Sequence, residues 1–241
     1  MGANRFEPHT HTAESSKCGR IPAAELVELY HANGYQSLAI TDHMHGTFIS
    51  LLYCFDDWAT CVDRFLDGYR RAKVRGDELG ISVILAMELR FPENDNDYLV
   101  YGIDEAWLYA HPYPYRTTAE EFFRRYSEEL LIIHAHPFRE ENKFARQEGA
   151  HGVELVNTHL DHDNYNEDTL AYCKERPDLF RVAGSDTHRK KQEAHAWVDC
   201  ERPILCAQDY IDTVKSGKYT LGAKLEQNDA VLRAAREYFK E

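Results

Sequence analysis

The sequence predicts an α/β fold in a single domain. Short apolar runs read as buried strands, and segments with helical spacing separate several of them. Histidine and acidic side chains follow directly after these apolar runs, an arrangement that is typical of parallel β/α units. The chain has 241 residues, enough for one sizeable core, and a single α/β barrel is compatible with that length. No linker, low-complexity segment or internal repeat divides it, so residues 1–241 are expected to form one domain.

The first half of the chain alternates expected strands with expected helices. Pro22 opens a helix whose apolar residues recur at helical spacing until Gly34. Residues 56–79 form a long charged helix pattern, and the basic residues at its end are interpreted as a solvated face rather than an anion site. The expected strands here are residues 6–11, 37–41, 81–89 and 98–103.

The second half continues the same alternation. Thr118 is expected to cap a helix that begins at Ala119. The expected strands are residues 130–134, 152–157, 181–184 and 219–221, and the remaining expected helices are residues 163–175, 209–216 and 228–239. The last helix is amphipathic, so it is expected to close the fold by packing one apolar face onto it.

The composition is that of a globular protein with an acidic surface. Hydrophobic residues make up 43% of the chain and charged residues 29%, as in ordinary soluble domains. The 28 Lys and Arg residues against 41 Asp and Glu give a formal net charge of -13, so we expect neither a broad nucleic-acid surface nor a membrane-binding surface. A small anionic substrate is still compatible with this charge, because bound metal ions would dominate the local potential.

No export or anchoring signal is found in the sequence. The first residues lack a positively charged region followed by an apolar core, and no apolar run is long enough to span a bilayer. The six cysteines contain no CxxC pair and are expected to be free thiols. These features predict a cytoplasmic protein.

Histidines and acids recur at the ends of the expected strands. His9 and His11 lie on one face if residues 6–11 are a strand, roughly 6.6 Å apart along the chain. A lone histidine is usually structural, but structural histidines have no reason to follow successive strands. Glu88 ends an apolar strand, where burial would be costly without a cation. Imidazole and carboxylate suit zinc, manganese and iron, so the pattern predicts a polynuclear metal centre.

One arginine is placed to contact a substrate phosphate. Arg139 lies two residues beyond Pro137 and could bind a phosphate with two parallel hydrogen bonds. The alternative is a surface arginine paired with Glu140 or Glu141. The same pocket could be lined by Asn157, His159 and His45. No GxSxG or Cys/His signature supplies a protein nucleophile, so no catalytic residue is expected beyond a metal-bound hydroxide.

Five motifs in this order resemble the PHP (polymerase and histidinol phosphatase) family. They are HTHT at residues 9–12, TDH ending at His43, the strand-terminal Glu88, HP at His136, and GSDTH containing Asp186 and His188. The resemblance covers nearly the whole chain. It implies a single distorted TIM-like (β/α)7 barrel, two or three divalent metal ions at the carboxyl ends of the strands, and phosphoester hydrolysis.

The resemblance also implies a ligand for each metal position. His9, His11, Glu88 and Asp186 are similar to the ligands of a first metal, and Glu88 would bridge to a second metal held by His136. His43 and His188 are similar to two ligands of a third metal. The acid or histidine that usually completes this third set is replaced here by Glu14 or Cys18, and Glu14 is favoured because carboxylates bridge hard cations well. Asp97 stands where many members have a histidine, so it is a further possible ligand.

Three functions remain open from the sequence. The leading hypothesis is a metal-dependent phosphoesterase acting on a small phosphorylated metabolite or nucleotide. The alternatives are a metallohydrolase of another bond, such as carbon to nitrogen, and a catalytically silent metal-binding module that partners another protein. Arg139 favours a phosphate over an uncharged substrate, and retention of all the strand-end ligands favours an enzyme over a silent module.

Overall fold

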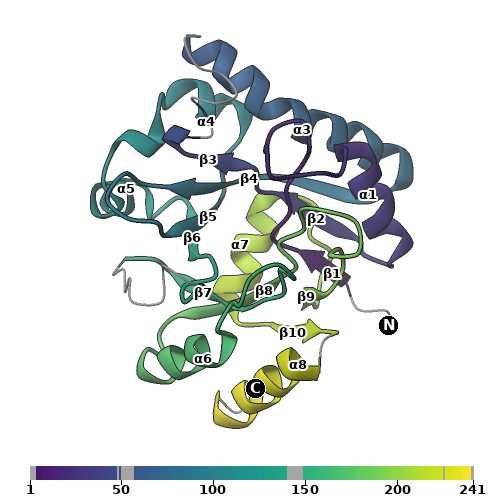
Figure 1. Cartoon of the computed structure of the whole chain (residues 1–241), viewed down its shortest axis with the longest axis vertical. Helices are drawn as coiled ribbons and strands as arrows, with labels where there is room; N and C mark the ends of the chain where they lie inside the picture. The colour runs from purple at the N-terminus through teal and green to yellow at the C-terminus, as the bar shows by residue number, and fades with distance from the viewer. Residues whose placement is uncertain (1–3, 48, 50–56, 140–148, 225, 240–241) are drawn as a thin grey trace.

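The computed structural model describes residues 4–47, 49, 57–139, 149–224 and 226–239, and Figure 1 shows their arrangement. Ten strands form one mixed sheet in the order β10-β9-β1-β2-β4-β5-β6-β7-β8, with β3 paired to β4. The sheet curves into a nearly closed barrel with helices around it. The α/β class and the distorted TIM-like barrel expected from the sequence are thereby confirmed.

The elements are short and regularly spaced along the chain. The strands are β1 (Asn4–Glu7), β2 (Ser37–Ile40), β3 (His43–Met44), β4 (Ser82–Arg90), β5 (Asp97–Tyr101), β6 (Leu131–His134), β7 (Gly152–Asn157), β8 (Phe180–Gly184), β9 (Ala196–Cys200) and β10 (Tyr219–Ala223). The helices are α1 (Ala23–Ala32), α3 (Trp58–Leu79), α4 (Glu105–Ala110), α5 (Ala119–Tyr126), α6 (Asn166–Glu175), α7 (Ala207–Ser216) and α8 (Glu226–Phe239), and η1 (Pro114–Arg116) is a short 3₁₀ turn. Each strand expected from the sequence is present within a few residues of its expected bounds, and Thr118 caps α5 as predicted by accepting the Glu121 N–H.

The first strand is shorter than the pattern predicts. β1 ends at Glu7 because Pro8 has no N–H to donate to a neighbouring strand. The chain stays extended beyond it, and Thr10 forms an isolated parallel bridge with Thr187. His9 and His11 therefore lie on the extended segment that continues the strand.

The sheet also contains antiparallel strands, which an array of β/α units does not. β5 pairs antiparallel with both β4 and β6, with Glu88 of β4 opposite Leu99 of β5. Six residues connect β4 to β5, too few for the helical crossover that a parallel pair needs. β9, which the sequence pattern did not reveal, pairs antiparallel with β1 and β10.

Side chains close the barrel where the strand ladder is interrupted between β8 and β9. Ser185, just after β8, accepts the Ala196 N–H through its hydroxyl oxygen at 3.0 Å. Tyr219 at the start of β10 donates its hydroxyl hydrogen to the Arg181 carbonyl at 2.9 Å. These bonds hold the two edges of the sheet together.

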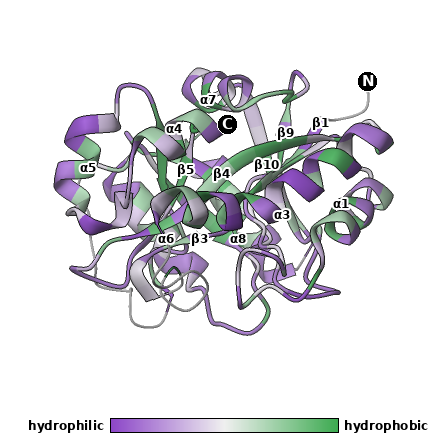
Figure 2. Cartoon of the chain, turned by 90° about the horizontal axis from the view of Figure 1, so that it is seen from above, coloured by the Kyte–Doolittle hydropathy of each residue, from purple (hydrophilic) through white to green (hydrophobic). Residues whose placement is uncertain are grey.

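The apolar core fills the barrel and its outer layer. The strands are mainly hydrophobic in Figure 2, whereas α1, α3 and α5 carry hydrophilic outward faces. Helix α7 packs against the strands through Tyr210, whose ring centroid lies 4.4 Å from that of Phe6 and 4.8 Å from that of Tyr101. This packing buries the apolar face of α7 against the strands.

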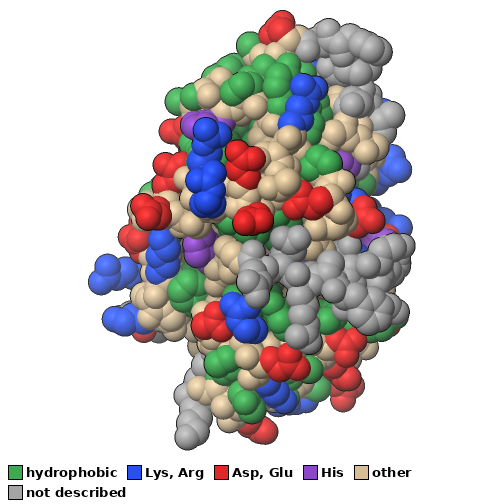
Figure 3. Space-filling view, turned by 90° about the vertical axis from the view of Figure 1, so that its left-hand side faces the viewer, with side chains coloured by type: hydrophobic (Ala, Val, Ile, Leu, Met, Phe, Trp, Pro, Cys, Tyr) green, Lys and Arg blue, Asp and Glu red, His purple; other side chains and the backbone are tan. Residues whose placement is uncertain are grey.

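Three sequence expectations concern membrane-spanning segments, surface charge and the thiols. Over the described residues, no helix combines the length and apolar character needed to cross a membrane. On the face shown in Figure 3, basic side chains are interspersed with acidic ones and form no continuous basic patch. The five cysteines at described positions are free thiols, and Cys54 lies outside the described residues.

Candidate metal centre

The predicted strand-end residues meet around one cavity of about 810 Å³. His9 and His11 are completely buried, behind the side chains that form the cavity wall. The predicted residues in the cavity wall are Cys18, His43, His45, Glu88, Asp97, His136, Arg139, His159, Asp186 and His188. The wall also contains Arg20, Arg90, Asp161, His162 and Arg189. The sequence therefore identified most of the residues that the fold assembles.

Four buried side chains form the first group of candidate ligands. His9 Nε2 lies 3.2 Å from His11 Nε2 and 3.3 Å from Asp186 Oδ1. His11 Nε2 lies 3.3 Å from the same aspartate oxygen and 3.3 Å from Glu88 Oε2. His9 Nε2 is also 3.5 Å from Glu88 Oε1. Two imidazoles and two carboxylates thus point at one another from segments far apart in sequence.

This group fits a divalent metal ion. Ligands that bind one ion at about 2.1 Å lie roughly 3.0 to 3.4 Å from one another, close to the spacing of these four side chains. Asp186 Oδ1 and Glu88 Oε2 are buried yet have no well-formed hydrogen bond among the described residues, an arrangement that costs free energy unless a cation is present.

Neighbouring charges favour the metal-binding forms of Glu88, Asp186 and His11, whereas His9 must lose a proton to bind a metal. Burial opposes protonation of His9, but Asp186, Glu154 and Glu88 outweigh it and raise its pKa well above the usual range. Burial opposes ionisation of Glu88, but His43 and His9 hold its pKa well below the usual range. Burial likewise opposes ionisation of Asp186, but His9 and Arg139 hold its pKa well below the usual range. Burial and the neighbouring His188 lower the pKa of His11, so its imidazole is neutral. Carboxylate and neutral imidazole are the protonation states that bind metals.

His136 and Glu88 form the second group. His136 Nε2 lies 3.0 Å from Glu88 Oε1, so Glu88 faces both groups, as the expected bridging role requires. Asp97 Oδ2 is 3.9 Å from His136 Nε2, but its two carboxylate oxygens accept hydrogen bonds from Arg90 at 2.7 and 2.6 Å. His134 lies two residues before His136 and stacks on Tyr98 instead.

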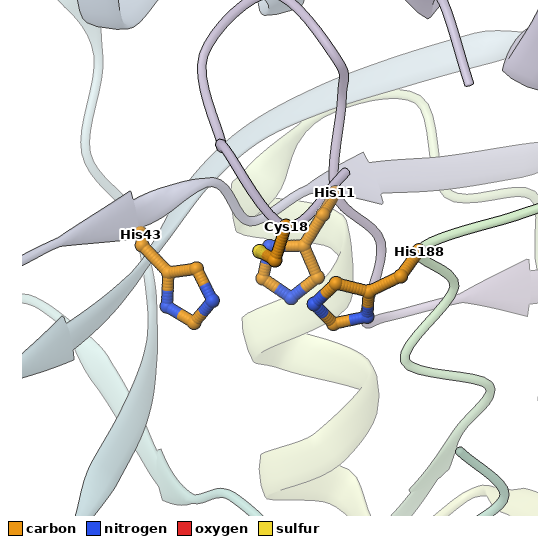
Figure 4. Close-up of side chains that lie close together, drawn as sticks. All are labelled: His11, Cys18, His43 and His188. Atoms are coloured by element: carbon orange, nitrogen blue, oxygen red, sulfur yellow. The ribbon is translucent and has the colours of Figure 1, made fainter. Parts of the chain in front are cut away.

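Cys18 completes the third group. One donor atom each of His11, Cys18, His43 and His188 lies within 4.8 Å of the others. Figure 4 shows His43 and His188 on either side of His11 and Cys18. The register of β3 on β4 places His43 opposite Glu88, and His43 Nδ1 lies 2.9 Å from Glu88 Oε2. Burial raises the pKa of the Cys18 thiol, but His43 and His188 outweigh it and lower this pKa to about 7.

The structure places Glu14, the residue favoured from the sequence over Cys18, outside the third group. The Glu14 carboxylate accepts the Ala23 N–H at 2.9 Å and so caps the first turn of α1. Pro22 precedes this helix and offers no side-chain cap, so an external carboxylate satisfies the unpaired N–H. Glu14 is thus held at the helix end and not among the histidines.

Arg139 contacts the centre directly. Its guanidinium donates to Asp186 Oδ2 at 2.6 Å, to Asn157 Oδ1 at 2.9 Å and to Asn164 Oδ1 at 2.9 Å. The alternative partners Glu140 and Glu141 lie outside the described residues. Arg139 is therefore fixed in the cavity wall beside a candidate ligand.

The other predicted pocket residues surround the same cavity. His159 lies against His188, with ring centroids 4.7 Å apart, and its N–H donates to Asn157 Oδ1. His45 packs edge-on against His43. Burial lowers the pKa of both His45 and His159 to about 4, so these two side chains are neutral near pH 7.

Three buried acids beneath the centre were not among the predicted site residues. Glu154 Oε1 accepts from His9 Nδ1 at 3.0 Å, which leaves His9 Nε2 to face the ligand group. Glu7 accepts the His9 and Ser185 N–H groups, and burial raises its pKa to about 7. Asp42 accepts the N–H and hydroxyl of Thr12. A charged residue within an apolar strand was the available signal for Glu154, as it was for Glu88. The first strand, NRFE, offers no such signal for Glu7.

Two candidate ligands have unusual backbone conformations. His136 has φ of 27° and Asp186 has φ of 51°, in the left-handed region that residues other than glycine rarely adopt. Such strain persists only where the surrounding structure imposes it, and it concentrates at functional sites.

Comparisons with known proteins agree with the sequence resemblance. A family model described as the PHP domain matches residues 7–175, which leaves Asp186 and His188 beyond the matched segment. No match was found among curated proteins. The structural relatives below share less than 25% of their residues with this chain, so they support the fold alone.

Three solved structures illustrate this likeness. A two-domain protein from Bacteroides vulgatus, described as containing a predicted PHP-like metal-dependent phosphoesterase, has a TM-score of 0.66 and 13% identity over 97% of this chain and 70% of its own. PsfC from Pseudomonas syringae has a TM-score of 0.65 and 15% identity over 100% of this chain and 99% of its own. A protein from Chromobacterium violaceum, described as an amidohydrolase with bound sulfate and no metal, has a TM-score of 0.50 and 13% identity over 93% of this chain and 99% of its own.

The matched segment and the site agree with each other. Residues 7–175 comprise most of the chain and include His9, His11, His43, Glu88 and His136. The barrel brings Asp186 and His188 to the same cavity from the part of the chain that follows. The chain belongs to the PHP domain family.

Proposed function

We propose that this protein is a metal-dependent phosphoesterase that releases phosphate from a small phosphorylated metabolite or nucleotide. The observation that carries the proposal is a buried set of imidazoles and carboxylates with Arg139 beside it, in the wall of one cavity. This cavity, at about 810 Å³, is large enough for a small metabolite. Two or three divalent ions, zinc, manganese or iron, would be held by the three groups described above.

The candidate ligands would position the metal ions at which hydrolysis takes place. Divalent ions bound here would lower the pKa of a water molecule and stabilise charge on the attacking and leaving oxygens. Glu154 holds the His9 ring through Nδ1, and the backbone N–H of His136 donates to the other oxygen of the same carboxylate. These contacts fix His9 and His136 relative to each other, so their ligand atoms are preorganised.

Arg139 would bind and orient the phosphate. Its guanidinium is held in a defined orientation by three oxygen acceptors, including Asp186 Oδ2. An arginine fixed in this way loses little conformational entropy when it also contacts a phosphate oxygen. His45 and His159 are neutral near pH 7 and would act as hydrogen-bonding groups rather than as charged ones.

The test measures phosphate release and bound metal in the same samples. The protein would be reconstituted separately with zinc, manganese and ferrous iron and assayed against sugar phosphates and mononucleotides. We expect release from at least one substrate, and its loss in His9→Ala together with loss of metal. His31→Ala changes an exposed histidine at the end of α1 and serves as the matched control.

Two results would contradict the proposal. One is undiminished phosphate release by His9→Ala after its metal has been lost. The other is no release by metal-loaded protein from any member of the panel. Two to three bound ions without any hydrolysis would instead support the silent metal-binding module.

A second candidate is hydrolysis of a carbon–nitrogen bond. The likeness to a protein described as an amidohydrolase supports this candidate. The same type of metal centre could serve hydrolysis of a phosphoester or of a carbon–nitrogen bond. Arg139 counts against this candidate, since a partly buried guanidinium at the centre suits an anionic substrate better than a neutral amide. Assaying an amide panel with the same reconstituted samples separates the two.

A further inference from the structure

Cys18 is positioned by the same backbone segments that carry two candidate ligands. Ser16 accepts the His43 N–H through its hydroxyl oxygen at 3.0 Å. Two residues beyond Cys18, the Arg20 N–H donates to the His188 carbonyl at 2.6 Å. The segment from Ser16 to Arg20 is therefore attached to β3 at one end and to the segment after β8 at the other, with the thiol between them.

Close packing restricts this segment further. A side chain at Gly19 would place its Cβ 2.5 Å from the Thr12 carbonyl oxygen, so the loop can approach only because this residue is glycine. The Gly19 N–H also donates to the Ser16 carbonyl at 2.9 Å. Because a short loop with these contacts has little freedom, the Cys18 sulfur is held near the His43 and His188 rings.

Two acids close to this group in sequence are engaged elsewhere. Glu14 caps α1 by accepting the Ala23 N–H, and Asp42 accepts the N–H and hydroxyl of Thr12. Sulfur is thus the donor that the loop itself brings to this position. Thiolate is a soft ligand that favours zinc and iron, whereas the two carboxylates of the first group also suit harder ions such as manganese.

We propose that Cys18 is a thiolate ligand, with His43 and His188, of a metal position that prefers zinc or ferrous iron to manganese. This inference deepens the proposed function and rests on the metal centre described there. The thiol proton passes to solvent when the sulfur coordinates the ion. One cavity would then hold a soft position beside a harder one formed by Glu88 and Asp186.

Cobalt substitution tests the ligand without relying on activity. The full chain would be stripped with chelator and loaded with Co²⁺, and its near-ultraviolet spectrum recorded. We expect a thiolate-to-cobalt charge-transfer band in the wild-type protein, unchanged in Cys206→Ser and absent in Cys18→Ala and Cys18→Asp. Cys206 is an exposed cysteine at the start of α7 and provides the matched control.

Metal competition tests the preference. Loss of a side chain that hydrogen-bonds to a metal ligand typically weakens metal binding roughly 10- to 100-fold. Cys18→Ala removes a ligand itself, so zinc binding at this position is expected to weaken by at least as much. Cys18→Asp should keep the total number of bound ions but shift zinc-over-manganese preference by at least about tenfold, because oxygen replaces sulfur. Circular dichroism would establish that each variant is folded.

The outcomes separate this inference from the proposed function. A band that survives in folded Cys18→Ala, or no band in cobalt-loaded wild-type protein, overturns the thiolate ligand even if phosphate is released. A band that depends on Cys18, in a protein that releases no phosphate, supports the ligand and refutes the phosphoesterase. An unchanged zinc preference in Cys18→Asp overturns the proposed selectivity.

Discussion

Glu154 Oε1 lies 3.0 Å from His9 Nδ1, although 145 residues separate them in sequence. The other carboxylate oxygen accepts the His136 N–H at 3.0 Å and the Asn157 amide at 2.8 Å. The His136 N–H and the Asn157 amide are donors, and the contact of Glu154 with His9 favours a hydrogen on His9 Nδ1. A side chain outside the ligand set thus controls how the first group faces the cavity.

Glu154→Gln is expected to weaken metal binding by about 10- to 100-fold. The glutamine NH₂ must face a donor on one side, either the His136 N–H or His9 Nδ1. If it faces His9, the hydrogen moves to Nε2, and His9 can no longer bind a metal through that atom. Chelator competition on the intact protein measures the effect.

Glu120→Gln removes an exposed carboxylate from α5 and is the control for Glu154→Gln. It should leave metal affinity unchanged, since its side chain faces solvent. Equal affinities for Glu154→Gln and the wild-type protein would show that His9 keeps its orientation without this carboxylate.

Arg139→Ala is expected to lower kcat/KM for a phosphoester by about 10- to 100-fold, the range for a lost hydrogen bond to a charged group. Most of the loss should appear as a higher KM if Arg139 binds ground state and transition state alike. Steady-state kinetics and metal analysis of the same preparation measure the effect, because Arg139 also contacts Asp186.

Arg189→Ala is the matched control for Arg139→Ala. Arg189 also borders the cavity but is 54% exposed, and its partner Asp161 is 39% exposed. Screening by solvent makes such a pair contribute little, so we expect less than about a threefold change. A larger loss in Arg189→Ala than in Arg139→Ala would mean that phosphate contacts the outer rim.

Gly68→Ala is expected to destabilise the protein although alanine is the better helix former. The new Cβ would lie 2.0 Å from Thr12 Oγ1, and that hydroxyl is held by its hydrogen bond to Asp42 at 2.7 Å. Overpacking costs about 1 to 3 kcal/mol, against a gain of up to about 1 kcal/mol from helix propensity. Urea unfolding in the presence of chelator measures the difference.

Gly46→Ala provides the comparison for Gly68→Ala. A Cβ at Gly46 would find its nearest neighbour, a Tyr115 ring carbon, at 3.8 Å, an ordinary contact distance. We expect only a small change in the free energy of unfolding. If Gly68→Ala were the more stable of the two variants, the packing of α3 on the Thr12 loop would be looser than the structure indicates.

His151→Asn is expected to reduce the loss of stability at acidic pH. His151 Nδ1 accepts the Ile132 N–H at 3.0 Å, which requires a neutral ring, and burial together with Lys215 lowers its pKa. The unfolded chain binds this proton more readily, so His151 contributes stability above about pH 6.5 that is lost as the pH falls. The asparagine carbonyl can accept the same hydrogen bond without titrating.

The measurement is the free energy of unfolding between pH 7.5 and pH 5 in chelator, which removes any effect of bound metal. His31→Asn at the end of α1 is the control and should follow the wild-type curve. A His151→Asn curve as steep as that of the wild-type protein would assign the acid sensitivity to other groups.

The sequence by itself determined the types of the candidate ligands and the strand ends near which they occur. Strands have a period of two, so His9 and His11 could be assigned to one face, and the resemblance to the PHP family implied that Glu88 and Asp186 join them. Gly152–Asn157 and the Thr118 cap were also predicted correctly, because alternation and capping are local properties of a few residues.

Only the tertiary structure shows that Cys18, and not Glu14, lies beside His43 and His188. Glu14 and Cys18 lie on the same short loop, and their directions depend on hydrogen bonds to Ala23, His43 and His188, which no local pattern encodes. The antiparallel direction of β5 and the contact between Glu154 and His9 have the same origin. Residue type is a local property, whereas the direction of a side chain in a loop is set by partners distant in sequence. For that reason the sequence predicted which residue types gather at the cavity, and the fold shows which of their atoms face one another.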